Sequence, residues 1–239
     1  METEKIRFRC SALGNIMTDA RSKSETISET AKAHCVDVFI SEKYGRKKDI
    51  SNKFITKGLM VEEDSITLFS RHTKTFFKKN EVQLKNHSIT GTPDLFEGEQ
   101  ILSATKIIDV KSSWDIYTFF RSRHDKLNSQ YFWQLQGYMA LTGAQSATLA
   151  YCLINTPEML IDDEKRKLQW KTGTIDDEQP EFKVACAEMD KLMRYDDIPM
   201  EERITMIDIP RDETAICRIY QRVADCRKWI AENLFSKNY

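Results

Sequence analysis

The sequence predicts an α/β protein in which a central mixed β-sheet is flanked by helices. Segments with helical spacing of apolar residues alternate along the chain with short, strand-like apolar runs. Apolar residues make up 41% of the 239 positions, which is enough for a packed core. Only eight glycines and five prolines interrupt the chain, so no low-complexity linker divides it. We therefore expect a single domain over residues 1–239.

The first half of the chain is predicted to form two helices and two extended segments. Residues 24–43 carry apolar side chains at helical spacing, and Ser24 can cap this helix. Residues 54–70 are predicted to form the second helix. Extended segments are expected near residues 81–96 and 104–112.

The second half is predicted to continue the alternation. A helix over residues 129–142 precedes a buried, β-rich strand at 146–155. Residues 157–200 are charged and predict helices and loops. The alternating segment 204–209 indicates an edge strand, and residues 212–235 form a long amphipathic helix.

The most informative strand carries an acid and an amine on one face. Lys106–Lys111 is extended and apolar at its centre, and successive side chains of a strand point to opposite faces. Asp109 and Lys111 therefore share one face, whereas Ile108 and Val110 share the other. A carboxylate inside an apolar strand is costly unless it is paired or bound to a metal, which favours a functional role.

A second carboxylate is expected beside this strand. Asp94 follows the extended run 88–92 at a Gly/Pro turn, and a hairpin would return the chain and bring Asp94 beside Asp109. Two carboxylates and the carbonyl of Val110 are hard oxygen ligands, which suit Mg²⁺ or Mn²⁺. The amine of Lys111 would then orient a water molecule or stabilise charge on a phosphate.

Taken together, these motifs resemble those of the PD-(D/E)xK nuclease superfamily. Glu62 follows Gly58 by four positions, as the acidic residue of that family's earlier helix does. Gln134 and Tyr138 match the Q-x-x-x-Y motif of the RecB-like and lambda-exonuclease-like (YqaJ-type) branch. The motifs cover roughly residues 55–140 and stand in the order of that branch.

The resemblance implies a restriction-endonuclease-like core over about residues 55–155, completed by a C-terminal strand and helix at 204–235. It implies the following catalytic set: Glu62, Asp94, Asp109, Lys111, Gln134 and Tyr138. It also implies that Glu62, directly or through water, joins Asp94, Asp109 and the Val110 carbonyl as metal ligands. Gln134 and Tyr138 would position the DNA phosphate or the metal-bound water.

The leading interpretation is a metal-dependent, ATP-independent DNA exonuclease of the phage recombination type. It would act 5′ to 3′ on linear duplex ends, and a single-strand annealing protein and a homo-oligomer are the partners that such enzymes suggest. The chain has no phosphate-binding G-x-x-x-x-G-K-[S/T] loop, so no motor is expected. Two alternatives stay open: a structure-specific or defence DNA endonuclease on the same fold, and a catalytically idle DNA-binding subunit.

DNA binding must come from local patches, because the net charge is only −1. The resemblance implies that Arg9, Ser11 and Arg21 grip a 5′-phosphate, and Ser112 and Ser113 can donate to a phosphate. Basic candidate patches, each of which is otherwise a solvated face, are Arg46–Lys48 with Lys53 and Lys57, Arg71 with Lys74, Lys78 and Lys79, and Arg121 with Arg123 and Lys126. Four aromatic residues after the strand are either core or a platform for an unpaired base: Trp114, Tyr117, Phe119 and Phe120.

Cysteine usage and hydropathy favour a reduced, membrane-free compartment. No pair of the six cysteines has C-x-x-C spacing, so zinc is not expected. The late cysteines are too widely spaced for the iron–sulfur cluster of some RecB-like relatives. No apolar run reaches the roughly 18 residues that span a bilayer, and the charged start predicts no signal peptide. We expect a cytoplasmic protein, in the host cytoplasm if it is phage-encoded.

Overall fold

A four-stranded mixed sheet forms the centre of the computed structural model, which describes residues 3–48, 51–173 and 179–235. Its strands lie in the order β4 (Leu95–Glu97), β5 (Lys106–Ser112), β6 (Ser146–Cys152) and β7 (Ile204–Pro210). β5 runs parallel to β6, whereas β4 and β7 pair antiparallel to their neighbours. A smaller sheet has the order β1 (Phe8–Arg9), β3 (Ile89–Gly91) and β2 (Leu84–Lys85).

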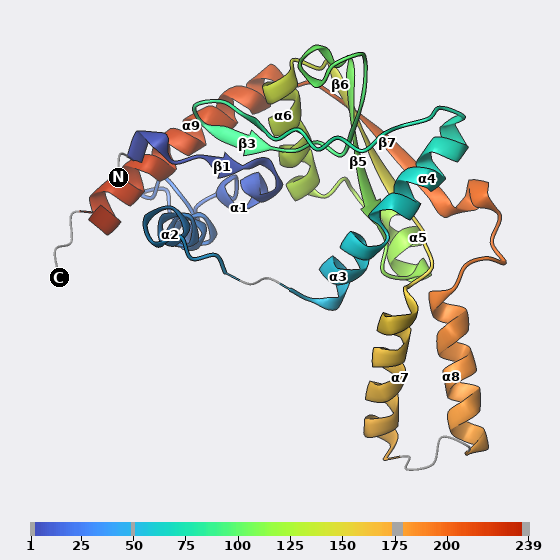
Figure 1. Ribbon diagram of the computed structural model, residues 1–239. Coiled ribbons are helices and arrows are strands. Elements are labelled where there is room, and N and C mark those ends of the chain that lie inside the picture. Colours follow the sequence, from blue (N-terminus) through green and yellow to red (C-terminus); the bar gives the residue numbers. More distant parts are fainter. Residues whose placement is uncertain (1–2, 49–50, 174–178, 236–239) are drawn as a thin grey trace.

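Helices surround both sheets (Figure 1). In the described ranges they are α1 (Leu13–Ile16), α2 (Glu29–Tyr44), α3 (Lys53–Met60), α4 (Glu62–Thr73), α5 (Ile116–His124), α6 (Ser129–Thr142), α7 (Glu158–Thr172), α8 (Pro180–Met193) and α9 (Glu213–Ile230). A 3₁₀ turn, Cys10–Ala12, links β1 to α1, and a π-helical turn, Ala231–Phe235, follows α9. The predicted α/β class, with a central mixed sheet flanked by helices, is confirmed.

The two faces of the central sheet are covered by different helices. Ile107 and Leu149 lie in one apolar cluster with side chains of α6 and α9. Ile108 and Val110 lie in another with side chains of α4. A strand that is buried on both faces is apolar throughout, which explains the run around Asp109. The alternation predicted for β5 is therefore present, and it directs Asp109 towards α6.

Several predicted elements have the observed bounds, and others do not. The helix predicted at 129–142 coincides with α6, and β7 lies at the sheet edge as expected. The helix predicted at 24–43 begins later, at Glu29, because Ser28 rather than Ser24 caps it and accepts from the Ala31 N–H at 3.0 Å. Helix α5 was not predicted, although Asp115 caps it by accepting from the Thr118 N–H at 2.7 Å.

The helix predicted over residues 54–70 is two helices, interrupted at Val61. Val61 has φ −109° and ψ 16°, outside the helical range, and its side chain is buried. The interruption places Glu62 in the first turn of α4 instead of the middle of a longer helix. A carboxylate is favoured there, because the N–H groups of a first turn carry partial positive charge.

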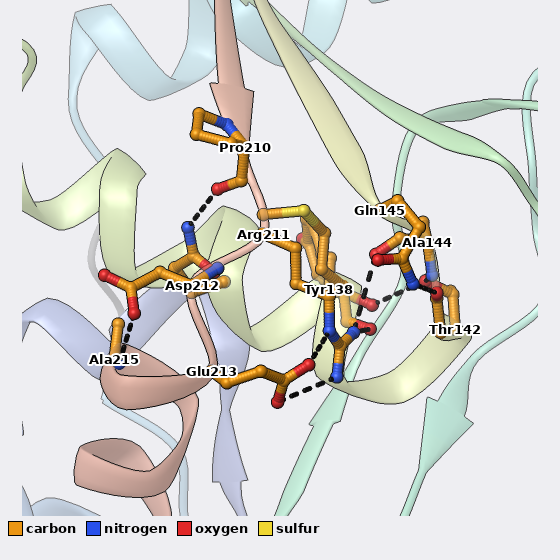
Figure 2. A network of polar contacts seen from close by, with 12 residues as sticks. Tyr138, Thr142, Ala144, Gln145, Pro210, Arg211, Asp212, Glu213 and Ala215 are labelled. Carbon is orange, nitrogen blue, oxygen red and sulfur yellow. Dashed lines mark hydrogen bonds and ion pairs between the residues drawn. The ribbon is translucent and has the colours of Figure 1, made fainter.

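A buried polar network fixes α6 to the connection between β7 and α9. The Gln136 amide has no exposed surface; it donates to the Pro210 carbonyl and accepts from the Asp212 N–H, both at 2.9 Å. Arg211 extends across the C-terminal turn of α6, where it donates to the Met139 carbonyl, and pairs with Glu213 (Figure 2). The oxygen and the nitrogen of the Gln136 side-chain amide thus each have a hydrogen-bond partner, as a buried amide requires. The network sets the position of the turns on either side of Gln136.

The other side of α6 is held by a close approach of α1. A Cβ atom on Gly14 would lie 2.8 Å from the Cα of Gln130, at the first turn of α6. No side chain fits at that distance from a backbone atom without movement of one helix. Gly14 therefore allows α1 and α6 to pack in contact.

Helices α7 and α8 form an antiparallel hairpin that projects from the rest of the molecule (Figure 1). They separate β6 from β7 in the sequence, although the two strands pair directly. An ion pair between Lys165 and Asp190, at 2.8 Å, joins the two helices. Trp170 of α7 is 85% exposed.

Two sequence expectations concern the cysteines and the membrane. All six cysteines are free thiols; Cys10, Cys35, Cys152 and Cys226 are buried, whereas Cys217 is exposed. No helix in the described part of the chain is both long and apolar enough to cross a bilayer.

We predict that Gly14→Ala lowers the free energy of unfolding by about 1–3 kcal/mol, because the added methyl group overpacks the α1–α6 contact. Gly58→Ala is the matched control, since no atom lies within 4 Å of a Cβ at that helical position. It should instead stabilise the protein by about 0.5–1 kcal/mol. Urea unfolding of both variants measures the difference, and equal effects would contradict the proposed contact.

Candidate active site

Two carboxylates lie together where β4 meets β5. Leu95 pairs with Ile108, so Asp94, immediately before β4, lies at the level of Asp109. Asp94 Oδ2 accepts from the Val110 N–H at 2.8 Å. Asp94 lies beside Asp109 as predicted, but the strand that pairs with β5 is not the one that was expected. The hairpin partner is β4, after Asp94, whereas the run before it belongs to β3 in the smaller sheet.

Asp109 is the centre of a side-chain network. Its carboxylate has no exposed surface, and Oδ1 accepts from Gln134 Nε2 at 2.9 Å. Oδ2 lies 2.7 Å from Lys111 Nζ. The same Gln134 nitrogen lies 3.1 Å from the Tyr138 hydroxyl. The structure thus brings four predicted site residues into one connected group.

The Tyr138 ring packs closely against the backbone of β3 at Gly91. A Cβ atom on Gly91 would lie 2.6 Å from Tyr138 Cε1 and 3.0 Å from the Cys10 side chain. Glycine at this position of β3 therefore lets the Tyr138 ring pack against the strand. The smaller sheet and the turn at Cys10 thereby support the helix that carries Gln134.

The charges in this group shift its pKa values. Burial, and then the neighbouring Asp109 charge, raise the pKa of Asp94 to about 7, against the opposing effects of Lys111 and the Val110 N–H. Burial alone would lower the pKa of Lys111, but Asp109 and Asp94 outweigh it and raise that pKa well above its usual range. Lys111 is therefore a permanent cation, and it does not fully neutralise two adjacent carboxylates.

The donor set suits a hard divalent cation. Asp109 Oδ2 is buried, and among the residues described its polar partner is the ammonium of Lys111, with which it forms an ion pair. The N–H and C=O of one strand residue point to the same edge, so the Val110 carbonyl faces the Asp94 side. Within the described ranges, no three Asp, Glu, His or Cys side chains form a complete metal site on their own. Two carboxylates and a carbonyl fit an ion that keeps positions for water or substrate.

Glu62 lies near this pair of carboxylates but has a partner of its own. Its charge contributes to the raised pKa of Asp94, which places it within electrostatic reach. Its Oε2 atom forms an ion pair with Lys79 Nζ at 2.7 Å. The structure therefore places Glu62 beside the group and not within its hydrogen-bonded network.

A pocket of about 630 Å³ opens beside Lys111. Its lining combines cationic, hydroxyl and aromatic side chains, among them Arg121, Lys126, Ser112, Ser113, Phe54, Trp114, Tyr131 and Tyr151. Helix α5, which the sequence analysis missed, supplies part of this wall. Ser112 Oγ lies 2.7 Å from Ser65 Oγ, and Ser113 is buried. Positive charge with aromatic rings is the combination that binds unpaired nucleic acid.

Of the four aromatic residues predicted as core or platform, one is core and three have exposed surface; a platform role for those three stays a prediction. Phe119 has no exposed surface and belongs to the core. Trp114 lines the pocket and contacts Phe54, with ring centroids 5.3 Å apart. Tyr117 is 63% exposed, and Phe120 is 41% exposed beneath Arg123.

The predicted DNA-binding cations have different outcomes. Lys57 is 1% exposed and donates to the Trp114 carbonyl at 2.8 Å, so its assignment to a DNA-binding surface was wrong. Its aliphatic stem and ammonium are enclosed by Trp114 and Tyr195, and burial lowers its pKa to about 7. Lys53 is paired with Glu164, and Arg123 donates to Thr205 and to the Glu202 carbonyl.

The residues predicted to grip a 5′-phosphate lie at the surface. Arg9 and Ser11 are exposed on either side of Cys10, and Arg21 is exposed between α1 and α2. Neither arginine side chain forms an ion pair with any residue that the structure describes. Their role in binding DNA stays a prediction.

Comparisons with solved structures identify proteins of the same fold. The crystal structure of a phage-related exonuclease from Haemophilus somnus 129PT matches with a TM-score of 0.76 and 26% sequence identity, over 97% of this chain and 96% of that one. An alkaline exonuclease from Laribacter hongkongensis, LHK-Exo, matches with a TM-score of 0.64 and 16% identity, over 97% and 92% of the two chains. The structure of LHK-Exo in complex with dAMP matches with a TM-score of 0.61 and 18% identity, again over 97% of this chain and 92% of that one.

The resemblance to lambda-exonuclease-like and YqaJ-like nucleases, first indicated by the motifs, is confirmed by these structures. No protein-family model matches the sequence, and no curated protein gives a significant match.

We predict that Asp94→Asn stabilises the metal-free protein at pH 8. The pKa of Asp94 is raised in the folded state, so the native protein binds more protons than the unfolded chain between its ordinary pKa of 3.8 and about 7. Wild-type stability should fall as pH rises through that window. The variant should lack this loss and gain about 1–2 kcal/mol over the wild type at pH 8, with little gain at pH 4.

Asp208→Asn is the control for this measurement. Thr148 and Lys106 lower the pKa of Asp208, so its removal should give no gain at pH 8. Urea unfolding at several pH values with EDTA present measures both variants. Parallel pH profiles for Asp94→Asn and the wild type would contradict the electrostatic account of the site.

Proposed function

Because the chain shares the fold of phage-related exonucleases, we propose that it is a divalent-metal-dependent, ATP-independent DNA exonuclease of the phage recombination type. One observation carries the proposal. Asp94 and Asp109 lie together with Lys111 and Gln134, in the arrangement that the nuclease motifs require. The phage-related exonuclease of similar fold, and the dAMP bound to LHK-Exo, support DNA as the substrate.

Asp94, Asp109 and the Val110 carbonyl would hold Mg²⁺ or Mn²⁺, with Glu62 in direct or water-mediated contact. The bound ion would supply Lewis acidity and lower the pKa of a water molecule. Gln134 fixes the orientation of the Asp109 carboxylate through Oδ1, and Tyr138 lies against the same amide nitrogen. The aspartate thus keeps one geometry while the charge around it changes.

Lys111 is suited to act on the reacting groups. Its ammonium stays protonated, contacts Asp109 and lies over the Tyr131 ring, 5.3 Å from the centroid, in the wall of the pocket. From there it orients the attacking water or stabilises negative charge that develops on the phosphate. The pocket would hold the nucleotide next to that phosphate, with Arg121 and Lys126 near the sugar–phosphate chain.

The same proposal includes the direction of degradation and the kind of DNA end that is recognised. Arg9, Ser11 and Arg21 are proposed to read a 5′-phosphate, which gives degradation from 5′ to 3′. A single-strand annealing protein is the proposed partner for the strand that remains. A structure-specific endonuclease is the rival, because the same active site can cleave at internal positions.

We predict that Asp109→Asn abolishes cleavage and that EDTA does the same to the wild type. Lys111→Ala should lower turnover by roughly 100-fold or more while metal binding, measured by calorimetry with Mn²⁺, is largely retained. Lys106→Ala is the control on the same strand; its ammonium pairs with Asp208, away from the acidic pair, and activity should be unchanged. Undiminished activity in EDTA would exclude the metal mechanism, and loss of Mn²⁺ binding by Lys111→Ala would make that residue's role structural.

We predict that linear duplex DNA is degraded to mononucleotides or short oligonucleotides and that covalently closed circles stay intact. A 5′-phosphorylated end should be degraded faster than a 5′-hydroxyl end, and Arg9→Ala should reduce that preference. Because binding uses contacts between cations and phosphates, activity should fall as salt is raised, and the slope should be shallow if only a few such contacts form. A time course in which closed circles are nicked before linear ends are lost would favour the endonuclease.

A further inference from the structure

A basic loop with one exposed aromatic residue follows α4, apart from the pocket beside Lys111. Phe76 is 89% exposed, and Arg71, Lys74 and Lys78 surround it in the sequence and are exposed as well. The side chains of these three cations form no ion pair or hydrogen bond with any residue that the structure describes. Phe76 and the cations line a second pocket, of about 560 Å³, which shares no residue with the first.

The loop presents Phe76 to solvent because the backbone on both sides of it is hydrogen-bonded to Ser70. Phe77 enters the apolar cluster under α4, with its ring centroid 5.2 Å from that of Phe69. The Thr75 N–H donates to the Ser70 carbonyl at 3.1 Å, and the Phe77 N–H donates to Ser70 Oγ at 3.2 Å. With the backbone fixed on both sides, the Phe76 side chain lies at the surface. An exposed aromatic ring held in this way is ready to receive a ligand.

The start of the loop is also conformationally unusual. Lys74 has φ 55°, in the left-handed region that residues other than glycine rarely adopt. It ends α4 by donating its N–H to the Arg71 carbonyl at 3.3 Å. This turn separates the Lys74 side chain from the helix and directs the chain towards Phe76. As the C-cap of α4, Lys74 adopts the left-handed conformation in which many helices end, and this fixes where the loop begins.

The far end of the loop is attached to the active site. Lys79 pairs with Glu62 at 2.7 Å. Asn80 is buried; its N–H donates to the Asp94 carbonyl at 2.8 Å and its amide donates to the Pro93 carbonyl at 2.9 Å. A ligand on Phe76 would therefore be bound by a segment that also contacts Glu62 and Asp94, two of the proposed metal-binding residues.

We propose that this loop binds an unpaired stretch of a DNA strand, with a base stacked on Phe76 and phosphates contacted by Arg71, Lys74 and Lys78. The inference rests on the proposed nuclease function and adds a second strand-binding surface to it. Glu63 and Glu81 line the same pocket, and Lys79 is paired with Glu62, but the other three cations still outnumber these two carboxylates, so the surface favours a polyanion. Base stacking on one ring is independent of sequence, as degradation from any duplex end requires.

The test measures the affinity of fluorescein-labelled DNA in EDTA, where no cleavage competes. Three probes are compared: a single strand, a blunt duplex, and a duplex with a single-stranded tail. Phe76→Ala should weaken binding of the single strand and the tailed duplex by about tenfold, in the range of one lost base stack, and should affect the blunt duplex less. Phe76→Trp should restore affinity. Lys78→Ala should reduce the salt dependence of single-strand binding by about 0.7 in the log–log slope.

Trp170→Ala removes another ring that is highly exposed, on α7, and is the matched control. It should leave all three affinities unchanged. The proposal is overturned if Phe76→Ala leaves the affinity for the tailed duplex unchanged, or if Trp170→Ala weakens binding equally. Either result, with wild-type cleavage of linear DNA intact, rejects only this surface. A wild type that neither binds nor cleaves DNA rejects the proposed function as well.

Discussion

Burying the Asp109 carboxylate in the middle of an apolar strand is unfavourable by several kcal/mol unless both of its oxygens are satisfied. The neighbouring elements meet this requirement together. Helix α6 brings the Gln134 amide to one oxygen, and β5 itself brings Lys111 to the other. The position of α6 is consequently under tight constraint. Contact with α1 at Gly14 fixes it on one side, and the buried Gln136 amide fixes it on the other.

The fold was predictable where local signals and burial agree. Helix α6 has its predicted bounds because the Asn128 side chain caps its start and Gly143, with φ 82°, ends it. The shared face of Asp109 and Lys111 followed from the period of a strand. The break at Val61 was not predictable, because no glycine or proline marks it and only the buried environment of that side chain favours it. Asp115 did carry a signal for α5 in the sequence, since aspartate is a frequent helix cap.

Within the site, the residues found from sequence are those with a chemical reason to be there. The residues that the sequence did not reveal, such as Gln136, have their role through contacts with distant parts of the chain. Gln136 has the same residue type as Gln134 two positions earlier, yet it faces the β7–α9 connection instead of Asp109. Lys57 had the sequence context of a solvated cation, but α3 carries it between Trp114 and Tyr195. Spacing along the chain does not distinguish these cases, because each depends on which element packs against the helix.

The α7–α8 hairpin has a consequence for how the sheet assembles. Cys152 at the end of β6 pairs with Ile204 at the start of β7. The segment between these two residues must therefore bring its ends together before β7 can join the sheet. The entropy lost on closing a flexible loop grows only with the logarithm of its length, and two packed helices shorten the effective loop further. Helical hairpins form from local contacts and fold faster than distant strands pair. The hairpin is thus expected to form first and to bring β7 to the sheet edge, so that the order of folding, and not only the final stability, depends on helices that supply none of the proposed catalytic residues.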